Sequence, residues 1–301
     1  MADTTLLRGT PLAKEITDRV FDGVAELRDR GVVPTLGTVL MSDDESALAF
    51  MDRKHERCRA VGIPTERIDL SPEESAATLY EAVERLANDE AVTALFVQAP
   101  LPDHVDGDAV RERIPTAKDV DCFAFENLGL LVADSPRVRP ATPAAVLRLL
   151  RGYDVETAGA DVCIVGRTTE ICRPLANLLL QRGPAGDATV TVCHSHTTDL
   201  GAKTRAADVL VTAAGTPELV DASMVAPGAV VVDISVNRVS ADTEKGYELV
   251  GDVDFEGVRE RARAITPVPG GVGPLTLAML LRNVVTLTAR QADVESPFDE
   301  D

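Results

Sequence analysis

Continuous apolar runs that are typical of buried strands alternate with amphipathic helical patterns along most of this 301-residue chain. The run "AVTALFVQAP" at residues 91–100 is apolar without interruption, as strands buried on both faces of a parallel sheet are. "ESALAFMDRKHERCRAVG" at residues 45–62 has the period of a helix. The segment 71–89 predicts another helix, with Ser71 as its N-cap and Pro72 at its first position. This alternation restricts the fold to the α/β class with a parallel sheet.

The same alternation restarts in the second half of the chain. Strands are predicted at 161–166, 188–194, 208–215 and 229–235, and helices at 144–153 and 171–183. Successive βαβ units predict a doubly wound sheet whose strand carboxyl ends form one ligand-binding edge. We therefore place a domain boundary near residue 142. By its pattern alone, the last amphipathic helix can belong to either domain.

Acidic residues outnumber basic ones and give the chain a net charge of −19. Lysine is scarce, at positions Lys14, Lys54, Lys118, Lys203 and Lys245. A chain charged in this way repels nucleic acid and anionic membranes, so neither is an expected partner. The charge also fits a cytoplasm rich in salt, where screening shortens self-repulsion to about 3 Å at 1 M. We expect a protein from a halophile.

Neither a metal centre nor a membrane span is expected. The five cysteines are scattered without a CxxC pair, and the four histidines lack the spacing of zinc-binding helices. No apolar run approaches the length of a membrane span, and the N-terminal sequence lacks the basic and apolar segments of a signal peptide. A cytoplasmic location is the expectation.

A turn from strand to helix at Gly166 is a candidate dinucleotide site, because pyrophosphate binds the free N–H groups of a helix N-terminus. The full glycine fingerprint is absent. The next strand ends in "CHSHT" at 193–197, without the carboxylate that usually binds the ribose of NAD. Together with Arg167, this favours NADP if a dinucleotide binds. The alternative is an ordinary turn whose arginine pairs with a surface acid.

The segment "PVPGGVGPLT" at 267–276 places three prolines and three glycines within eight residues, directly before the last helix. Proline fixes φ, and glycine opens backbone conformations closed to other residues, so the segment has a tightly specified shape. Pro274 suits the first turn of the helix. Two interpretations fit, a demanding connector or a backbone wall against a ligand.

Residues of the first half form a candidate acid–base group. Phe50 and Lys54 are four apart and share one helix face. Gln98 follows an apolar strand, and Asp119 and Asp121 lie in a loop. A lysine beside a glutamine and a carboxylate can act as a general acid or base, because burial tunes its pKa. Taken singly, each has an ordinary alternative as an exposed lysine, a strand end or a turn residue.

Taken together, the motifs resemble one family, that of methylenetetrahydrofolate dehydrogenase/methenyltetrahydrofolate cyclohydrolase. The resemblance covers about residues 5–290 and rests on "VQAPLP", "PTAKDVDCF", "PATP", "VGRTTEICRP", "VTVCHSHT", "GDVDF" and "PVPGGVGPLT" in this order. It implies two α/β domains with a cleft between them, and a homodimer formed through the nucleotide domain. The implied domains are a folate-binding domain at 1–141, completed by the helix 273–292, and a Rossmann-like NADP-binding domain at 142–267.

The resemblance also implies roles for individual residues. Lys54 matches the catalytic lysine, Gln98 the glutamine that positions it, and Asp121 the aspartate that holds the pterin. Substrate-binding positions match Phe50, Pro269, Gly270, Gly271 and Thr276, and cofactor-binding positions match Gly166, Arg167, Thr168, Ser195 and Val236. The implied reaction oxidises 5,10-methylenetetrahydrofolate with NADP and hydrolyses the methenyl product to 10-formyltetrahydrofolate, in the one-carbon metabolism that feeds purine biosynthesis.

The chain departs from the family's pattern at several positions. Phe50 replaces the usual tyrosine, which keeps an aromatic face but removes a hydroxyl donor near Lys54. The other departures are Ser42, Ala141, Ala145, Cys172 and Ser235. The first implies an alternative function, a dehydrogenase with impaired cyclohydrolase activity. A folate binder without turnover would have no need for Lys54, and an oxidoreductase of the shikimate dehydrogenase kind would explain only the second half.

Overall fold

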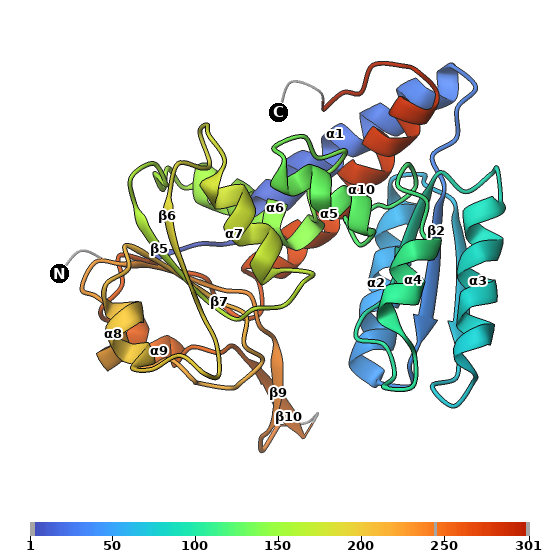
Figure 1. The fold of residues 1–301 in the computed structure, drawn as a ribbon. Coiled ribbons are helices and arrows are strands. Elements are labelled where there is room, and N and C mark those ends of the chain that lie inside the picture. The colour runs from blue at the N-terminus through green and yellow to red at the C-terminus, as the bar shows by residue number, and fades with distance from the viewer. Residues whose placement is uncertain (1–3, 244–245, 299–301) are drawn as a thin grey trace. The chain divides into compact units, whose positions relative to one another are not determined.

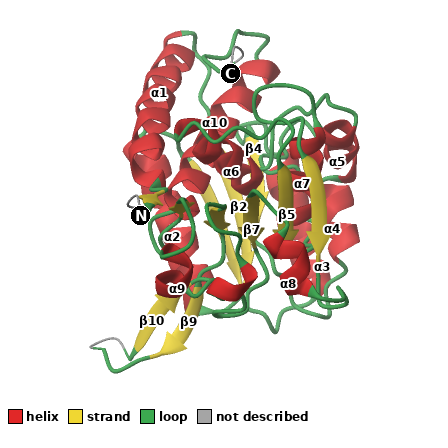
Figure 2. Ribbon diagram, turned by 90° about the vertical axis from the view of Figure 1, so that its left-hand side faces the viewer, coloured by secondary structure: helices red, strands yellow, loops and turns green. Residues whose placement is uncertain are grey.

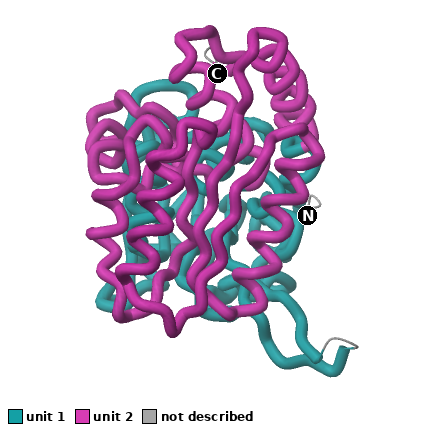
Figure 3. Tube along the Cα trace, turned by 90° about the vertical axis from the view of Figure 1, so that its right-hand side faces the viewer, with its two compact units in different colours: residues 1–13, 142–276 teal, residues 14–141, 277–301 magenta. Residues whose placement is uncertain are grey.

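A computed structural model describes residues 4–243 and 246–298. The chain divides into two compact units, drawn in different colours in Figure 3. Unit 1 contains residues 1–13 and 142–276, and unit 2 contains residues 14–141 and 277–301. The division therefore falls within helix α1 (Gly9–Asp29) and within helix α10 (Val272–Gln291).

Unit 2 is built around a parallel sheet in the order β3-β2-β4. Its strands are β2 (Leu36–Met41), β3 (Thr65–Leu70) and β4 (Ala94–Val97), and its helices are α2 (Glu45–Ala60), α3 (Ala76–Asn88), α4 (Gly107–Arg113) and α5 (Phe125–Val132). Every residue of β2 is buried, because this strand is central in the sheet and lies between α2 and α3 (Figure 1). The parallel sheet expected from the sequence is confirmed here.

The predicted start of α3 is wrong. The helix begins at Ala76 with Ser75 as its N-cap, whose Oγ accepts a hydrogen bond from the Thr78 N–H at 3.2 Å. Ser71 lies in a preceding turn, where its own N–H donates to the Glu74 carboxylate at 2.9 Å. Ser71 and Ser75 are both residue types that favour an N-cap. The hydrogen bond to Glu74 places Ser71 in the turn before the helix, so Ser75 is the N-cap.

Unit 1 contains a six-stranded parallel sheet in the order β1-β11-β8-β7-β5-β6, with its strands in yellow in Figure 2. Its strands are β1 (Thr5–Leu6), β5 (Asp161–Val165), β6 (Thr189–Cys193), β7 (Val209–Thr212), β8 (Val230–Asp233) and β11 (Ala264–Ile265). The run β6-β5-β7-β8-β11 has the 2-1-3-4-5 order of doubly wound folds, in which the winding reverses between β5 and β7. The doubly wound sheet expected from the sequence is confirmed.

Short helices connect these strands. They are α6 (Ala141–Gly152), α7 (Cys172–Leu180), α8 (Leu200–Arg205), the 3-10 helix η1 (Ala222–Met224) and α9 (Phe255–Arg259). A hairpin of β9 (Asn237–Ser240) and β10 (Tyr247–Val250) forms a separate antiparallel sheet that projects from the rest of the unit (Figure 1). The sequence analysis missed this hairpin, because each strand is only four residues long and largely exposed.

Helix α10 is long and apolar enough to cross a membrane by length and composition. However, 78% of its most apolar window is buried inside the molecule. Buried side chains occur all around it, among them Leu275, Leu281, Val284 and Leu287. The helix therefore has the character of a core helix.

Candidate active site

Lys54 lies on the buried face of α2, with Met51, His55 and Cys58. Asp44 fixes the start of this helix, because its carboxylate accepts hydrogen bonds from the Ser46 and Ala47 N–H groups. Only 1% of the Lys54 side chain is exposed. Among the described atoms, its Nζ has no hydrogen-bond partner. The reading of Lys54 as an ordinary exposed lysine is therefore wrong.

Burial lowers the pKa of Lys54 from 10.5 to about 7. The lost hydration of the ammonium is the main cause, and the charges of Asp121 and Cys58 oppose it. At neutral pH the amine is consequently present in both its neutral and its protonated form. A group with a pKa near the working pH can both accept and return a proton.

Two aromatic rings flank the Lys54 amine. Its Nζ lies 3.1 Å from the ring centroid of Phe96 and 5.1 Å from that of Phe50. The sequence analysis named Phe50 and missed Phe96. Strand alternation was the available signal, since Phe96 and Gln98 are two residues apart and so share one side of the chain. These rings hold the amine against an apolar wall and limit its access to water.

Gln98 follows β4 and is half-buried. Its Nε2 donates to the Ala99 carbonyl at 2.6 Å, whereas its Oε1 is buried without a partner among the described atoms. Buried polar atoms normally have partners, so Gln98 Oε1 and Lys54 Nζ are both available to a ligand or to each other. The pair supplies one acceptor and one amine.

The loop after β4 is organised by Asp119. Its buried carboxylate accepts from the N–H groups of Phe123 and Ala124 at 2.9 and 2.8 Å and from Asn127 Nδ2 at 2.8 Å. Asp121, two residues on, is half-buried, and its Oδ1 accepts from the Ala141 N–H at 2.6 Å. The sequence analysis placed both aspartates in a loop and assigned a role only to Asp121. Asp119 fixes the backbone that presents Asp121.

In unit 1, Gly166 lies between β5 and β7, where the winding of the sheet reverses. Its φ is +141°, and a Cβ there would come within 2.5 Å of the Ala213 carbonyl oxygen after β7. Only glycine fits this position. The Thr168 hydroxyl accepts from the Cys172 N–H at 3.3 Å at the start of α7, whose N-cap residue Ile171 makes no side-chain cap.

This edge of the sheet fits a dinucleotide. The first N–H groups of α7 are not the donors for a pyrophosphate, because Cys172 and Arg173 donate to the hydroxyl and the carbonyl of Thr168 and Pro174 has no N–H. Gly215, with φ +66°, has open space above its backbone, since no atom lies within 4 Å of where a Cβ would be. Within the described residues, no ion pair joins the exposed Arg167 guanidinium to a carboxylate. The pairing with a surface acid that the sequence left open is therefore not found.

The other predicted cofactor positions also follow the carboxyl ends of strands. Ser195 is exposed beyond the end of β6. Val236 follows β8, and 56% of this apolar side chain is exposed. An exposed valine at the same edge of the sheet as Gly166 is suited to an apolar contact with a ligand. The roles of both residues stay predictions.

Two of the three glycines of the segment 267–276 are required by the chain's own backbone geometry and packing. Gly270 has φ +110°. A Cβ on Gly271 would lie 2.8 Å from Thr266 Cβ and 2.9 Å from the Pro267 carbonyl oxygen. Pro269 is exposed and Thr276 half-buried. The interpretation as a demanding connector thus accounts for both glycines, and the substrate-binding role of these residues stays a prediction.

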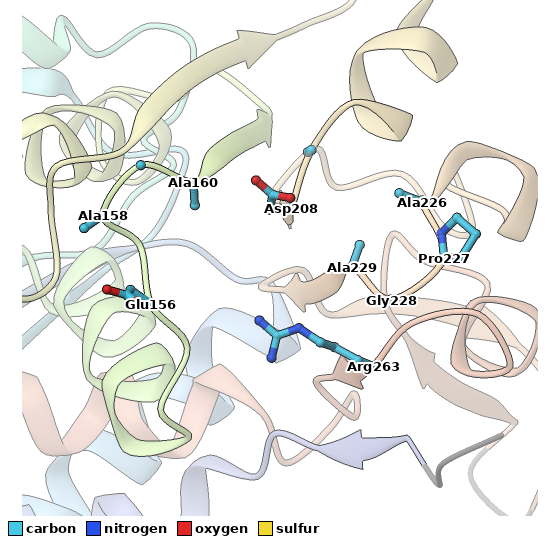
Figure 4. Close-up of a pocket in the computed structure, with 11 residues that line it drawn as sticks. Glu156, Ala158, Ala160, Asp208, Ala226, Pro227, Gly228, Ala229 and Arg263 are labelled. Atoms are coloured by element: carbon cyan, nitrogen blue, oxygen red, sulfur yellow. The ribbon is translucent and has the colours of Figure 1, made fainter.

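A cavity of about 370 Å³ lies at the other edge of the unit 1 sheet (Figure 4). Ala160, Asp208, Ala229 and Arg263, each directly before a strand, line it together with Glu156, Ala158, Gly159, Ala207, Ala226, Pro227 and Gly228. It contains none of the predicted site residues. Ligands of doubly wound sheets bind at the carboxyl ends of the strands, so this cavity is not the candidate active site.

No group of three or more potential metal-binding side chains is found where the structure describes the chain. A parallel sheet with a nucleotide-binding edge in one unit and a buried acid–base lysine in the other define the class, an α/β enzyme that uses a nucleotide cofactor. Residues 7–121 match the family model of the tetrahydrofolate dehydrogenase/cyclohydrolase catalytic domain, and residues 140–292 match that of its NAD(P)-binding domain. The chain belongs to the tetrahydrofolate dehydrogenase/cyclohydrolase family.

Similar proteins cover the whole length of this match. Bifunctional protein FolD of Natronomonas pharaonis is 50% identical over 97% of this chain and 98% of its own, and FolD 2 of Haloarcula marismortui is 49% identical with the same coverage. The structure of the Trypanosoma brucei dehydrogenase-cyclohydrolase complexed with NADP and an inhibitor has a TM-score of 0.91 at 37% identity, over 97% of this chain and 99% of that one. The resemblance inferred from the motifs is confirmed, including relatives from halophiles.

Proposed function

We propose that this protein oxidises 5,10-methylenetetrahydrofolate to its 5,10-methenyl form with NADP and hydrolyses that product to 10-formyltetrahydrofolate, in one-carbon metabolism that feeds purine biosynthesis. One observation carries the proposal. The amine of Lys54 is buried, has a pKa of about 7 and lies in the segment that matches the family's catalytic domain. A protein that only bound folate would gain nothing from such a group.

NADP, when bound, supplies the hydride acceptor for the first step. The contribution of the chain to this step is positioning, which can lower a barrier substantially without acid–base chemistry. The pyrophosphate would lie at the turn after β5, where Gly166 stands at the point of winding reversal. Phe50 offers an aromatic face to the folate, and Asp121 accepts hydrogen bonds from its pterin ring.

The second step adds one water and releases one proton overall. The neutral Lys54 amine takes a proton from the water that attacks the methenyl carbon. The bond from that carbon to N5 then breaks as the added hydroxyl becomes the formyl carbonyl. The Lys54 ammonium returns its proton to N5, and the hydroxyl proton is the one released to solvent. The Oε1 atom of Gln98 would accept a hydrogen bond from the amine and orient it, which the free state of this oxygen among the described atoms supports, because Nε2 of the same side chain already donates to Ala99. The pKa of about 7 serves both directions of this transfer.

The first test is an absorbance assay in about 1 M potassium chloride, where surface charge is screened. One arm supplies 5,10-methylenetetrahydrofolate with NADP, and the other supplies methenyltetrahydrofolate alone. We expect activity in both arms. A lack of activity in both arms would contradict the proposal and would show that the protein has the fold of the family without its activity.

The alternative, a dehydrogenase with impaired hydration, rests on Phe50. No hydroxyl reaches the Lys54 amine from this ring, whose centroid is 5.1 Å away. In the same assay, NADP reduction without hydration would establish this alternative. Restoration of hydration by Phe50→Tyr would then assign the loss to the missing hydroxyl.

Arg167 is expected to select NADP over NAD. Its guanidinium is exposed and has no ion pair among the described residues, so it is available to a 2′-phosphate. Arg167→Ala should raise the KM for NADP about tenfold or more, the usual cost of losing a charged hydrogen bond, and leave the KM for NAD nearly unchanged. Arg182→Ala, an exposed arginine after α7, is the matched control. Equal effects of Arg167→Ala on both cofactors would contradict the assignment.

We also propose a homodimer formed through unit 1. The projecting β9–β10 hairpin supports it, because an isolated two-stranded hairpin is marginally stable in water and gains stability from a partner surface. Leu249 leaves 36% of an apolar side chain exposed on it. A mass of one chain in sedimentation velocity would contradict the homodimer.

We also propose a cytoplasmic location, which fits the five free, buried cysteines.

A further inference from the structure

We propose that Asp252 is a positioning residue for the cofactor, because its buried carboxylate ties together the two loops that follow β7 and β8. These loops lie at the edge of the sheet where Gly166 and Val236 are found. The inference rests on the proposed binding of NADP at that edge. Neither the motif search nor the assignment of site residues gave Asp252 a role, although it belongs to the "GDVDF" segment at 251–255.

The loop after β7 wraps its backbone around this carboxylate. Asp252 Oδ2 accepts from the Ala214 N–H at 2.6 Å and from the Gly215 N–H at 3.2 Å, and Oδ1 accepts from the Thr216 N–H at 2.8 Å. Successive N–H groups that converge on one anion form a nest, which fixes the backbone conformation. β7 is one of the two strands between which the winding reverses, so this loop borders the expected ligand crevice.

The loop after β8 is tied to the same carboxylate by side chains. Ser235 Oγ donates to Oδ2 at 2.7 Å, and Asn237 Nδ2 donates to Oδ1 at 3.0 Å. Val236, the exposed residue expected to contact the cofactor, lies between these two donors in the chain. Asp252 therefore sets the position of Val236 from both sides.

By the resemblance, Ser235 is one of the departures from the family's pattern. Its hydroxyl bonds to Asp252, and it also accepts from the Gly215 N–H at 3.3 Å. This side chain thus joins the two loops.

Asp252 itself is held firmly and has no acceptor capacity to spare. It is fully buried, and its carbonyl accepts from the Val220 N–H at 2.9 Å. The next N–H, of Val253, donates to the Asp233 carboxylate at 2.9 Å. Five donors already fill the two oxygens of Asp252, about as many as a carboxylate can accept. It therefore acts through the loops and does not touch the cofactor.

The decisive experiment compares Asp252→Asn with the unchanged protein by calorimetric titration with NADP. The asparagine keeps the shape but replaces one acceptor oxygen with an NH₂ group that opposes the donors around it. We expect the Kd for NADP to rise about tenfold or more, because a buried donor is left unsatisfied. The KM for NADP should rise in parallel, with a smaller change in kcat.

Two further measurements separate a positioning role from general damage. Hydration of methenyltetrahydrofolate needs no NADP, so it should be retained in Asp252→Asn. Hydrogen exchange at the amides of residues 214–216 should become faster while exchange in the strands is unchanged. Asp254→Asn is the matched control. The Asp254 carboxylate caps α9 by accepting a hydrogen bond from the Gly257 N–H, and among the described residues it makes no hydrogen bond to the loops after β7 and β8. It should leave NADP binding unchanged.

Ser235→Ala is a second variant with a smaller structural change. It removes the hydroxyl that donates to Asp252 and leaves the Asp252 carboxylate in place. We expect a rise of about threefold in the Kd for NADP, near the lower end of the effect of one hydrogen bond. If Asp252→Asn does not fold, this variant and its exchange pattern decide the matter. Unchanged Kd in Ser235→Ala, or in a folded Asp252→Asn, overturns the inference. Failure of the unchanged protein to bind NADP would instead overturn the proposed function.

Discussion

Lys54→Met should abolish hydration of methenyltetrahydrofolate and at the same time make the protein more stable. Loss of a positioned acid–base group typically reduces a rate by about 10²–10⁴-fold, and we expect hydration to fall within this range. The hydride step should be affected less, since it depends on positioning. Absorbance assays of the two steps measure the difference. Unchanged hydration would contradict the role assigned to Lys54.

The stability gain follows from the lowered pKa. The unfolded lysine binds its proton up to pH 10.5, whereas the folded one loses it near pH 7. Below pH 7 the buried ammonium therefore costs on the order of 4 kcal/mol, and the cost fades as the pH rises from 7 to 10.5. In urea unfolding at about pH 6, Lys54→Met should have a clearly larger free energy of unfolding than the unchanged protein. The difference between the two should disappear above about pH 10.

Lys14→Met is the control for this measurement. Lys14 is exposed on α1 and pairs with Asp18 across one helical turn. Its removal should leave both activities intact and change stability little at any pH, because exposed pairs contribute little. A similar gain in Lys14→Met and Lys54→Met would show that lost surface charge, and not relief of a buried ammonium, stabilises the protein.

Transfer from about 1 M to about 0.01 M potassium chloride should destabilise the fold, because the screening length grows from about 3 to about 30 Å. The net charge is −19, because 49 acidic residues stand against 30 basic ones, and this excess of 19 negative charges repels itself when it is not screened. We expect Tm to fall by on the order of 10 °C, equivalent to a few kcal/mol for a chain of this size. Differential scanning calorimetry measures it.

A neutral osmolyte separates charge screening from other effects of a concentrated solution. Sucrose strengthens apolar burial but does not screen charge, so it should not restore the Tm lost at low salt in full. Equal Tm values at both salt concentrations would contradict the expectation of a halophilic protein, whatever the origin of its relatives.

Local patterns in the sequence predicted most of the framework. Helical period located α2, and with it the face that buries Lys54. Apolar continuity located β4 and the end of the strand where Gln98 lies. Strand alternation from Gln98 could also have identified Phe96. By contrast, the N-cap of α3 was misassigned, because Ser71 and Ser75 carry the same signal and only their contacts distinguish them.

The residues that hold the site together were not predictable in this way. Asp252 receives donors from two loops that are 15 to 38 residues away in the chain. No periodic pattern connects such positions, and "GDVDF" alone reads as an ordinary acidic turn. Asp119 was visible as a loop residue, but its three donors appear only when the loop has folded. Periodicity in the sequence predicts individual helices and strands. A buried carboxylate that accepts hydrogen bonds from several distant segments depends on the tertiary structure.

Asp119 and Asp252 have a consequence for how the two loop regions that they hold respond to salt. Both carboxylates are buried, and the donors around them described above are backbone N–H groups, two asparagine amides and one hydroxyl, with no arginine or lysine among them. Mobile ions weaken attraction between exposed charges, but they cannot enter a buried ring of hydrogen bonds. We therefore expect the loops held by Asp119 and Asp252 to keep their geometry when the ionic strength changes, even where the stability of the fold does change.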